Sequence, residues 1–167
     1  MILLNTEKND FVPVIAILMG SSSDAEIMEQ ARQICKDFDV SCEMKVLSAH
    51  RTPEHTINYA KAAKARGTKI IIAGAGGAAH LAGIVAAVTT LPVIGVPIKS
   101  KSLNGIDSLL SIVQMPAGIP VATVAIDGAA NAALLAIEIL ALSSPELTQK
   151  LESHRTKLQE KVLKSSV

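Results

Sequence analysis

The chain has 167 residues, of which 49% are hydrophobic and 19% are charged, a composition typical of one globular domain with a sizeable core. Sixteen basic and fifteen acidic residues give a net charge of +1, which is too small to favour a nucleic acid or an anionic membrane as the partner. One Tyr, two Phe and no Trp also leave few rings on which bases could stack.

The beginning of the chain predicts neither a secretory signal nor a membrane anchor. The first ten residues, MILLNTEKND, place acidic and amide residues directly after a short apolar patch, an order that a signal peptide does not have. The uncharged stretch 70–98 is long enough to span a bilayer, but glycines near its start and prolines near its end divide it into a strand, a helix and a strand. We expect a cytoplasmic protein with an N-terminal tail (1–11) and no membrane partner.

Five apolar segments are predicted to be strands, and a helical segment follows each of them. The strands are expected at 13–19, 40–47, 68–73, 92–97 and 120–126, and the helices at about 23–37, 53–66, 78–89, 105–114 and 128–142. This alternation predicts a parallel sheet with right-handed crossovers and helices on both faces. We therefore expect residues 12–142 to form a flavodoxin-like three-layer α/β domain with a five-stranded parallel sheet. Ligands bind at the carboxyl ends of the strands in such sheets.

Local signals set the expected helix boundaries. Ser23 and Glu26 have the spacing of a capping box, in which each side chain meets a backbone N–H of the first turn. Thr52 followed by Pro53 predicts a cap and a first helical residue, and Gly67 supplies a left-handed residue that ends the same helix.

Cys35 and Cys42 fall in a predicted helix and a predicted strand, without a Cys-x-x-Cys pair or a Cys/His cluster. Metal binding and disulfide formation therefore have little support, and we expect two reduced thiols in the core. No metal site is predicted in the chain.

Residues 143–167 predict an extra C-terminal helix outside the α/β domain. Ser144 can cap this helix and Pro145 can open it. Side chains at a spacing of three or four residues form one narrow stripe, which comprises Leu147, Leu151, His154, Leu158 and Val162. The stripe could pack on its own domain. Because the core is complete without it, we favour packing on a neighbouring subunit of a homo-oligomer.

The first strand-to-helix junction, MGSSSDAE at 19–26, places three serines after Gly20. Backbone N–H groups at a helix start, with hydroxyls beside them, bind phosphate well. The serines could equally act only as helix caps. No Gly-Lys-Ser/Thr follows, so the junction is not a Walker P-loop.

The second junction, VLSAHRTPEH at 46–55, places His50 and Arg51 side by side. Arginine can hold a phosphate through two parallel N–H bonds, and histidine can transfer a proton in both directions near neutral pH. Considered alone, the pair could also be two solvated loop residues.

The third junction, AGAGGAAHLAG at 73–83, contains the dinucleotide-binding pattern G-x-G-x-x-A in Gly74, Gly76 and Ala79. That pattern needs an acidic residue about twenty positions later for the ribose, and residues 55–106 contain no Asp or Glu. We therefore favour a loop whose backbone approaches a smaller ligand. His80 could be a core histidine or a polar group on the wall of a small apolar pocket.

Six blocks, in this order and spacing, closely resemble the N5-carboxyaminoimidazole ribonucleotide mutase family over about residues 12–142. The blocks are MGSSSD, SAHRTPE, AGAGGAAHLAG, LPVIGVP, GIDSLLSIVQMPAGIPVATVAI and GAANAALLAIEIL. The resemblance implies an isomerase of purine biosynthesis that moves a carboxylate from the exocyclic nitrogen of an aminoimidazole ribonucleotide to a ring carbon. It also implies that no cofactor is needed, and that the protein is a homo-octamer with sites at subunit borders.

The resemblance further implies roles for individual residues, matched block by block. His50 would be the general acid and base. The substrate would be bound by Ser21, Ser23 and Arg51 at its phosphate, with Ser48 nearby, by Asp24 at its ribose, and by Gly74, Gly76, Gly77, His80 and Leu81 around its carboxylate. The chain departs from many relatives at Ala82, where proline is common, at Ala117, where some have arginine, and in a shorter block after Ile126.

Two other functions remain open. A related branch carboxylates aminoimidazole ribonucleotide with free carbon dioxide, but it tends to have lysine after the histidine, so Arg51 favours the mutase. A non-catalytic, flavodoxin-like nucleotide-binding module belongs to a different class. A receiver of that class needs an acceptor aspartate after the third strand, where this chain has AGAGG.

Overall fold

A sheet of five parallel strands forms the centre of the computed structural model, which describes residues 12–165. The strands are β1 (Ile15–Met19), β2 (Cys42–Val46), β3 (Ile70–Gly76), β4 (Val93–Ile98) and β5 (Ala122–Thr123). They lie in the order β2-β1-β3-β4-β5, and every neighbouring pair is parallel. The predicted flavodoxin-like sheet is thus confirmed, whereas the tail 1–11 lies outside the described residues.

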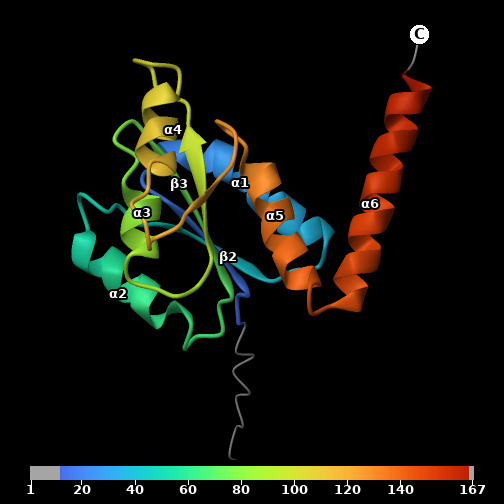
Figure 1. The fold of residues 1–167 in the computed structure, drawn as a ribbon, viewed down its shortest axis with the longest axis horizontal. Helices are drawn as coiled ribbons and strands as arrows, with labels where there is room; N and C mark the ends of the chain where they lie inside the picture. Colours follow the sequence, from blue (N-terminus) through green and yellow to red (C-terminus); the bar gives the residue numbers. More distant parts are fainter. Residues whose placement is uncertain (1–11, 166–167) are drawn as a thin grey trace, which may run out of the picture.

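Helices cover both faces of the sheet (Figure 1). The helical elements are the short 3-10 turn η1 (Ser22–Asp24), followed by α1 (Ala25–Asp37), α2 (Pro53–Ala63), α3 (Leu81–Ala86), α4 (Ile106–Val113), α5 (Ala129–Ala141) and α6 (Pro145–Lys164). Helices α1 and α5 pack on one face, and α2, α3 and α4 pack on the other. No helix within residues 12–165 is long and apolar enough to cross a membrane.

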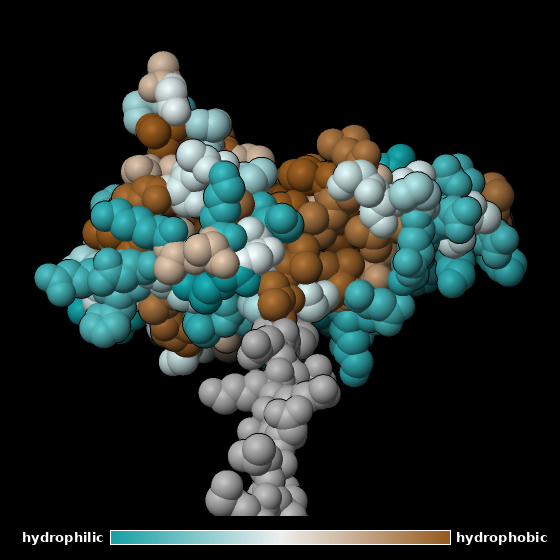
Figure 2. All heavy atoms as spheres, turned by 90° about the horizontal axis from the view of Figure 1, so that it is seen from below, coloured by the Kyte–Doolittle hydropathy of each residue, from teal (hydrophilic) through white to brown (hydrophobic). Residues whose placement is uncertain are grey.

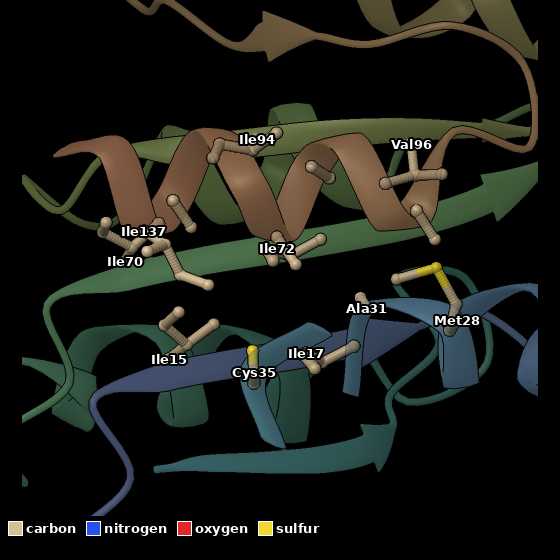
Figure 3. Close-up of a cluster of buried hydrophobic side chains, with 14 of the residues drawn as sticks. Ile15, Ile17, Met28, Ala31, Cys35, Ile70, Ile72, Ile94, Val96 and Ile137 are labelled. Carbon is tan, nitrogen blue, oxygen red and sulfur yellow. The ribbon is translucent and has the colours of Figure 1, made fainter. Parts of the chain in front are cut away.

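The two faces of the sheet follow from the alternation of side chains along buried strands. In β1, Ile15 and Ile17 belong to the core cluster on the α1 and α5 side, whereas Ala16 and Leu18 belong to the cluster on the opposite side. Figure 3 shows the first cluster, in which Ile15, Ile17 and neighbouring strand residues face side chains from α1 and α5, such as Cys35. Both sides of these strands are buried, which explains their continuous apolar sequence.

Three element boundaries differ from the sequence prediction. Strand β3 extends through Gly76, because Gly74 pairs with Met19 and Val96 in the ladder, so these glycines lie in a strand and not in a loop. Strand β5 is short, and it pairs with β4 only at two positions. Helix α3 is also shorter than the predicted 78–89, since the segment before Leu81 forms a turn around Gly77.

The predicted capping box is wrong. Helix α1 begins at Ala25, so Ser23 lies inside the preceding turn η1, where its hydroxyl donates to Asp24 Oδ1 (3.1 Å). The capping oxygen belongs to Ser21, which accepts from the Ser23 N–H (3.3 Å). Extra serines before the helix allow the chain to insert a 3-10 turn, and this moves the cap two residues earlier.

The predicted boundary signals of two other helices are partly confirmed. Thr52 precedes α2 as predicted, but its hydroxyl makes no cap and instead donates to Ser48 O (3.0 Å). Gly67 has the expected left-handed backbone (φ 95°). Ser144 caps α6 by accepting from the Leu147 N–H (3.4 Å), and Pro145 is the first residue of that helix.

The stripe along α6 divides into two halves. Leu147 and Leu151 pack against the core cluster, and His154 contacts the ring of Phe38. Leu158 is half exposed, and the later part of the helix stands away from the domain (Figure 1). The first half therefore packs on its own domain, while packing of the second half on a neighbouring subunit stays a prediction.

Candidate active site

The carboxyl ends of β1, β2, β3 and β4 border a cavity of about 590 Å³. All of the predicted site residues except Gly74 line it, namely Ser21, Ser23, Asp24, Ser48, His50, Arg51, Gly76, Gly77, His80 and Leu81. Three junctions that are far apart in the sequence thus meet at one edge of the sheet, as the parallel topology requires.

Gly74 has a packing role in this arrangement. It lies in β3, where a Cβ atom would collide with Met28 Sδ of α1. The absence of a side chain therefore lets α1 pack closely on the strand that leads to the cavity.

His50 and His80 contact each other in the cavity. The distance from His50 Nε2 to His80 Nδ1 is 2.9 Å, and the two rings are nearly perpendicular with centroids 5.0 Å apart. One nitrogen carries the shared hydrogen and the other accepts it, so the tautomer of one ring sets that of the other. The sequence predicted both histidines at the site but not this direct bond.

Arg51 connects the first two junctions. Its Nη2 donates to Gly20 O (2.9 Å), and its Nε donates to Ser48 Oγ (3.3 Å). Ser48 Oγ also accepts from the Arg51 backbone N–H (3.2 Å), which fixes the start of the side chain. The exposed guanidinium therefore lies beside the serine junction, where it can meet an anionic group of a ligand.

Asp24 is the buried acidic group of the site, with 8% of its surface exposed. Burial raises the pKa of its carboxyl group, and the hydrogen bonds from Ser23 and from the Ser21 backbone, together with the charge of Arg51, oppose this change. A ligand that donates hydroxyl hydrogens to Asp24 would compensate the carboxylate for its lost hydration.

The loop after β4 contributes three lining residues that sequence reasoning missed, Lys99, Ser100 and Lys101. They directly follow the end of β4, just as the three recognised junctions follow strand ends. This position could have identified them as candidate site residues. The Lys99 N–H donates to Asp127 Oδ1 (2.8 Å), and Asp127 belongs to the short block after Ile126. The two lysines add positive charge to a cavity that is also lined by Arg51 and Asp24.

The cavity can therefore bind an anionic small molecule and transfer a proton through its histidines. The dinucleotide alternative loses support, because Gly74 and Gly76 lie within β3 and not in the turn that would approach a pyrophosphate. The fold and the site together define a parallel α/β protein whose cavity contains a bonded histidine pair and an arginine.

Comparison with known proteins agrees with this description. The model of the family described as AIR carboxylase matches residues 14–161. The N5-carboxyaminoimidazole ribonucleotide mutase of Pyrococcus abyssi is 63% identical over 144 residues, which cover 86% of this chain and 83% of that protein. The enzyme of the same name from Bacillus subtilis is 56% identical over 156 residues, with 92% and 96% covered.

A solved structure is also similar. The crystal structure of Treponema denticola PurE has a TM-score of 0.82 at 32% identity, and the match covers 90% of this chain and 94% of that one. The chain belongs to the AIR carboxylase family.

Proposed function

We propose that the protein is an N5-carboxyaminoimidazole ribonucleotide mutase, which converts its substrate to 4-carboxy-5-aminoimidazole ribonucleotide in purine biosynthesis. The observation that carries this proposal is the bonded pair His50 and His80, which shares a cavity with the guanidinium of Arg51. The names of the relatives from Pyrococcus abyssi and Bacillus subtilis support the same activity.

The chemistry of the substrate explains why a histidine is needed. Protonation of the exocyclic nitrogen by charged His50 breaks the N–C bond of the carbamate, and this releases carbon dioxide and the free amine. The ring carbon, which the amine makes electron-rich, then forms a bond to carbon dioxide. Neutral His50 finally removes the proton from that carbon and restores the aromatic ring. One imidazole thus serves first as the acid and then as the base.

The remaining groups would hold the substrate in place. Arg51, with Ser21 and Ser23, is positioned for the phosphate, and Asp24 for the ribose hydroxyls. Carbon dioxide has to stay in the cavity between the two steps, so the wall beside the histidines must exclude water. The small apolar residues Ala75 and Ala78 line that wall.

We propose in addition that the protein is a homo-octamer in the cytoplasm. A dihedral octamer needs at least two different interfaces, and two separate apolar surfaces are exposed. One lies on α4 and the loop before it, with Leu103, Ile106, Leu110 and Val113. The other is a groove between α5 and α6, lined by Leu134, Leu135, Leu151 and Leu158, among others. Figure 2 shows hydrophobic surface between the body of the domain and α6.

The test is to give the purified protein N5-carboxyaminoimidazole ribonucleotide without ATP or metal, and to follow formation of the carbon-carboxylated isomer. A parallel reaction supplies aminoimidazole ribonucleotide and carbon dioxide. Turnover of the first substrate supports the mutase. Turnover of only the second would instead show the carboxylase, and binding without turnover would show a non-catalytic module.

A further inference from the structure

A buried serine on α4 contacts the ends of two strands that border the cavity. Ser108 has no exposed surface. Its Oγ accepts from the Gly77 N–H (2.8 Å) and donates to Ile98 O (2.6 Å). Gly77 directly follows β3, and Ile98 is the last residue of β4. A single hydroxyl therefore joins the end of β3, which leads to His80, to the end of β4, which leads to Lys99 and Lys101.

Gly77 is the residue at which the chain turns from β3 toward His80. It has a left-handed backbone (φ 65°), and its carbonyl accepts from the Ala79 N–H (2.8 Å). The Gly77 N–H that Ser108 binds belongs to the peptide between Gly76 and Gly77. The orientation of this peptide therefore determines the direction of the turn that leads to His80. Ser111, one turn after Ser108, also reaches Gly77 O (3.3 Å), although its shorter bond goes to Asp107 O (2.7 Å).

These bonds form a continuous path to the histidine pair. Ser108 holds Gly77, the turn after Gly77 carries His80, and His80 Nδ1 lies 2.9 Å from His50 Nε2. We propose that Ser108 is a positioning residue of the mutase, which keeps His80 in bonding distance of His50 without touching the substrate. This role rests on the proposed function, and Ser108 itself does not line the cavity.

The position of Ser108 explains why a hydroxyl is required there. Only a group that both accepts and donates can satisfy the Gly77 N–H and the Ile98 carbonyl together, and hydroxyl groups have this property. Alanine would leave the Gly77 N–H and the buried Ile98 carbonyl without this partner, so the turn would shift toward other partners. A displacement of about 1 Å in a catalytic group can lower turnover by about a hundredfold.

The test compares Ser108→Ala with Thr68→Val as a matched control. Thr68 is also buried, and its hydroxyl donates to Pro13 O (3.3 Å) at the opposite end of the sheet. Both changes remove one buried hydroxyl, but only the first lies on the path to the histidines. We expect Ser108→Ala to lower kcat about tenfold to a hundredfold with KM changed less than about threefold, and Thr68→Val to change neither.

A second measurement is independent of activity. NMR titration of the imidazole protons should show changed curves for His50 and His80 in Ser108→Ala, and unchanged curves for His55 and His154. This readout remains valid if the wild-type protein lacks mutase activity, in which case the proposed function fails and the positioning role is still tested.

The role is overturned if the two variants lose kcat equally, or if the His50 and His80 titrations match the wild type. Should Ser108→Ala fail to fold, Ser108→Cys replaces it, because a thiol keeps a weak donor and acceptor at similar size. We expect kcat and the histidine titration curves of Ser108→Cys to lie between those of the wild type and those expected for Ser108→Ala. If Ser108→Cys has the kcat and the titration curves of the wild type, the role is also overturned.

Discussion

The bond between His50 and His80 ties the proton on one ring to the tautomer of the other. If His50 Nε2 donates, His80 Nδ1 must be the acceptor, and the proposed transfer of a proton from His50 to the substrate would change that balance. A residue that acts first as acid and then as base benefits from such a partner, because the partner holds the ring in one orientation in both states.

Replacing His50 with asparagine separates proton transfer from binding. Asparagine keeps a hydrogen-bonding group of similar reach but cannot titrate, so we expect turnover to fall at least about a thousandfold while affinity changes only a few-fold. Steady-state kinetics and a binding titration with the product measure the two effects. His55→Asn, at an exposed position on α2, is the control and should keep wild-type turnover. More than about a tenth of the wild-type turnover in His50→Asn would point to His80 as the proton carrier.

Arg51 provides a test of the proposed phosphate site. Its guanidinium bonds to Gly20 O and Ser48 Oγ leave donors available for a ligand. Arg51→Ala removes paired, charge-assisted contacts, and we expect substrate to bind at least about tenfold more weakly. Arg32→Ala is the matched control, because Arg32 is exposed on α1, where it pairs with Glu29, and it does not line the cavity. An unchanged dissociation constant for Arg51→Ala would remove this residue from the site.

The site could be predicted from the sequence where its residues fall in recognisable junctions, as His50 and Arg51 do. Ser108 could not be found in this way, because its function depends on α4 lying against the end of β3, 31 residues away in the sequence. Lys99 and Lys101 had a usable signal in their place after the fourth strand, but lysines in a loop are commonly only solvated.

Among the elements, α1 and β2 each contain one cysteine, since Cys35 lies in α1 and Cys42 is the first residue of β2. The hydrogen bond from the Cys35 thiol and the charge of Arg32 lower the pKa of Cys42 to about 7, although burial acts in the opposite direction. The pKa of Cys35 is raised by the same hydrogen bond and by its burial. The shared proton therefore stays on Cys35, which lies in the core, and Cys42 is the thiol that ionises.

This difference predicts the pH dependence of alkylation. The thiolate is the reactive form, so a pKa below the usual value makes Cys42 react at lower pH than an ordinary thiol. We expect the rate of iodoacetamide labelling at Cys42 to rise as the pH passes through about 7, with Cys35 labelled much more slowly. Peptide mapping by mass spectrometry distinguishes the two sites. Faster labelling of Cys35 than of Cys42 would contradict the assignment of the proton.

The packing of α1 on β3 depends on Gly74. A methyl group there would meet the fully buried side chain of Met28, which must move within a packed core. We expect Gly74→Ala to lower the free energy of unfolding by about 1–3 kcal/mol, as overpacking does. Gly76→Ala is the control, because its Cβ would make only ordinary contacts, the nearest at 3.5 Å to Ile98 O. Equal stability of the two variants in urea unfolding would contradict this account.

The order of strands and helices was predictable because five apolar runs alternate with segments of helical length, although β5 is shorter than its run. The boundaries that failed depend on neighbours. Gly74 and Gly76 belong to β3 because β1 and β4 supply ladder partners there, and a glycine-rich sequence gives no sign of such partners. The turn η1 likewise results from competition among three adjacent serines, any of which can cap.

At the scale of the whole molecule, two exposed apolar surfaces lie on different sides of the fold. The α4 surface follows one helix face, since Ile106, Leu110 and Val113 have helical spacing and are each about half exposed. The other surface is the groove between α5 and α6, which ends at Leu158 in the second half of α6. In this half of the helix, Leu158 and Leu163 are exposed at 50% and 74%. Apolar helix faces of this kind are commonly buried by another protein chain.

Charged substitutions on α6 test the assembly without removing the helix. Leu147 and Leu151 pack on the core, so truncation before α6 would expose part of α5 as well. The double variant Leu158→Glu and Leu163→Glu instead changes two exposed positions, and it places carboxylates where an interface would bury them. We expect sedimentation to show a smaller oligomer and circular dichroism to show an intact fold.

Gln159→Glu is the control for these charges. It adds one charge to the same part of α6, but at a position that is already polar, so it should leave the oligomer intact. If the double variant sediments like the wild type, the second half of α6 is not an interface, and the α4 surface becomes the place to look for contacts between subunits.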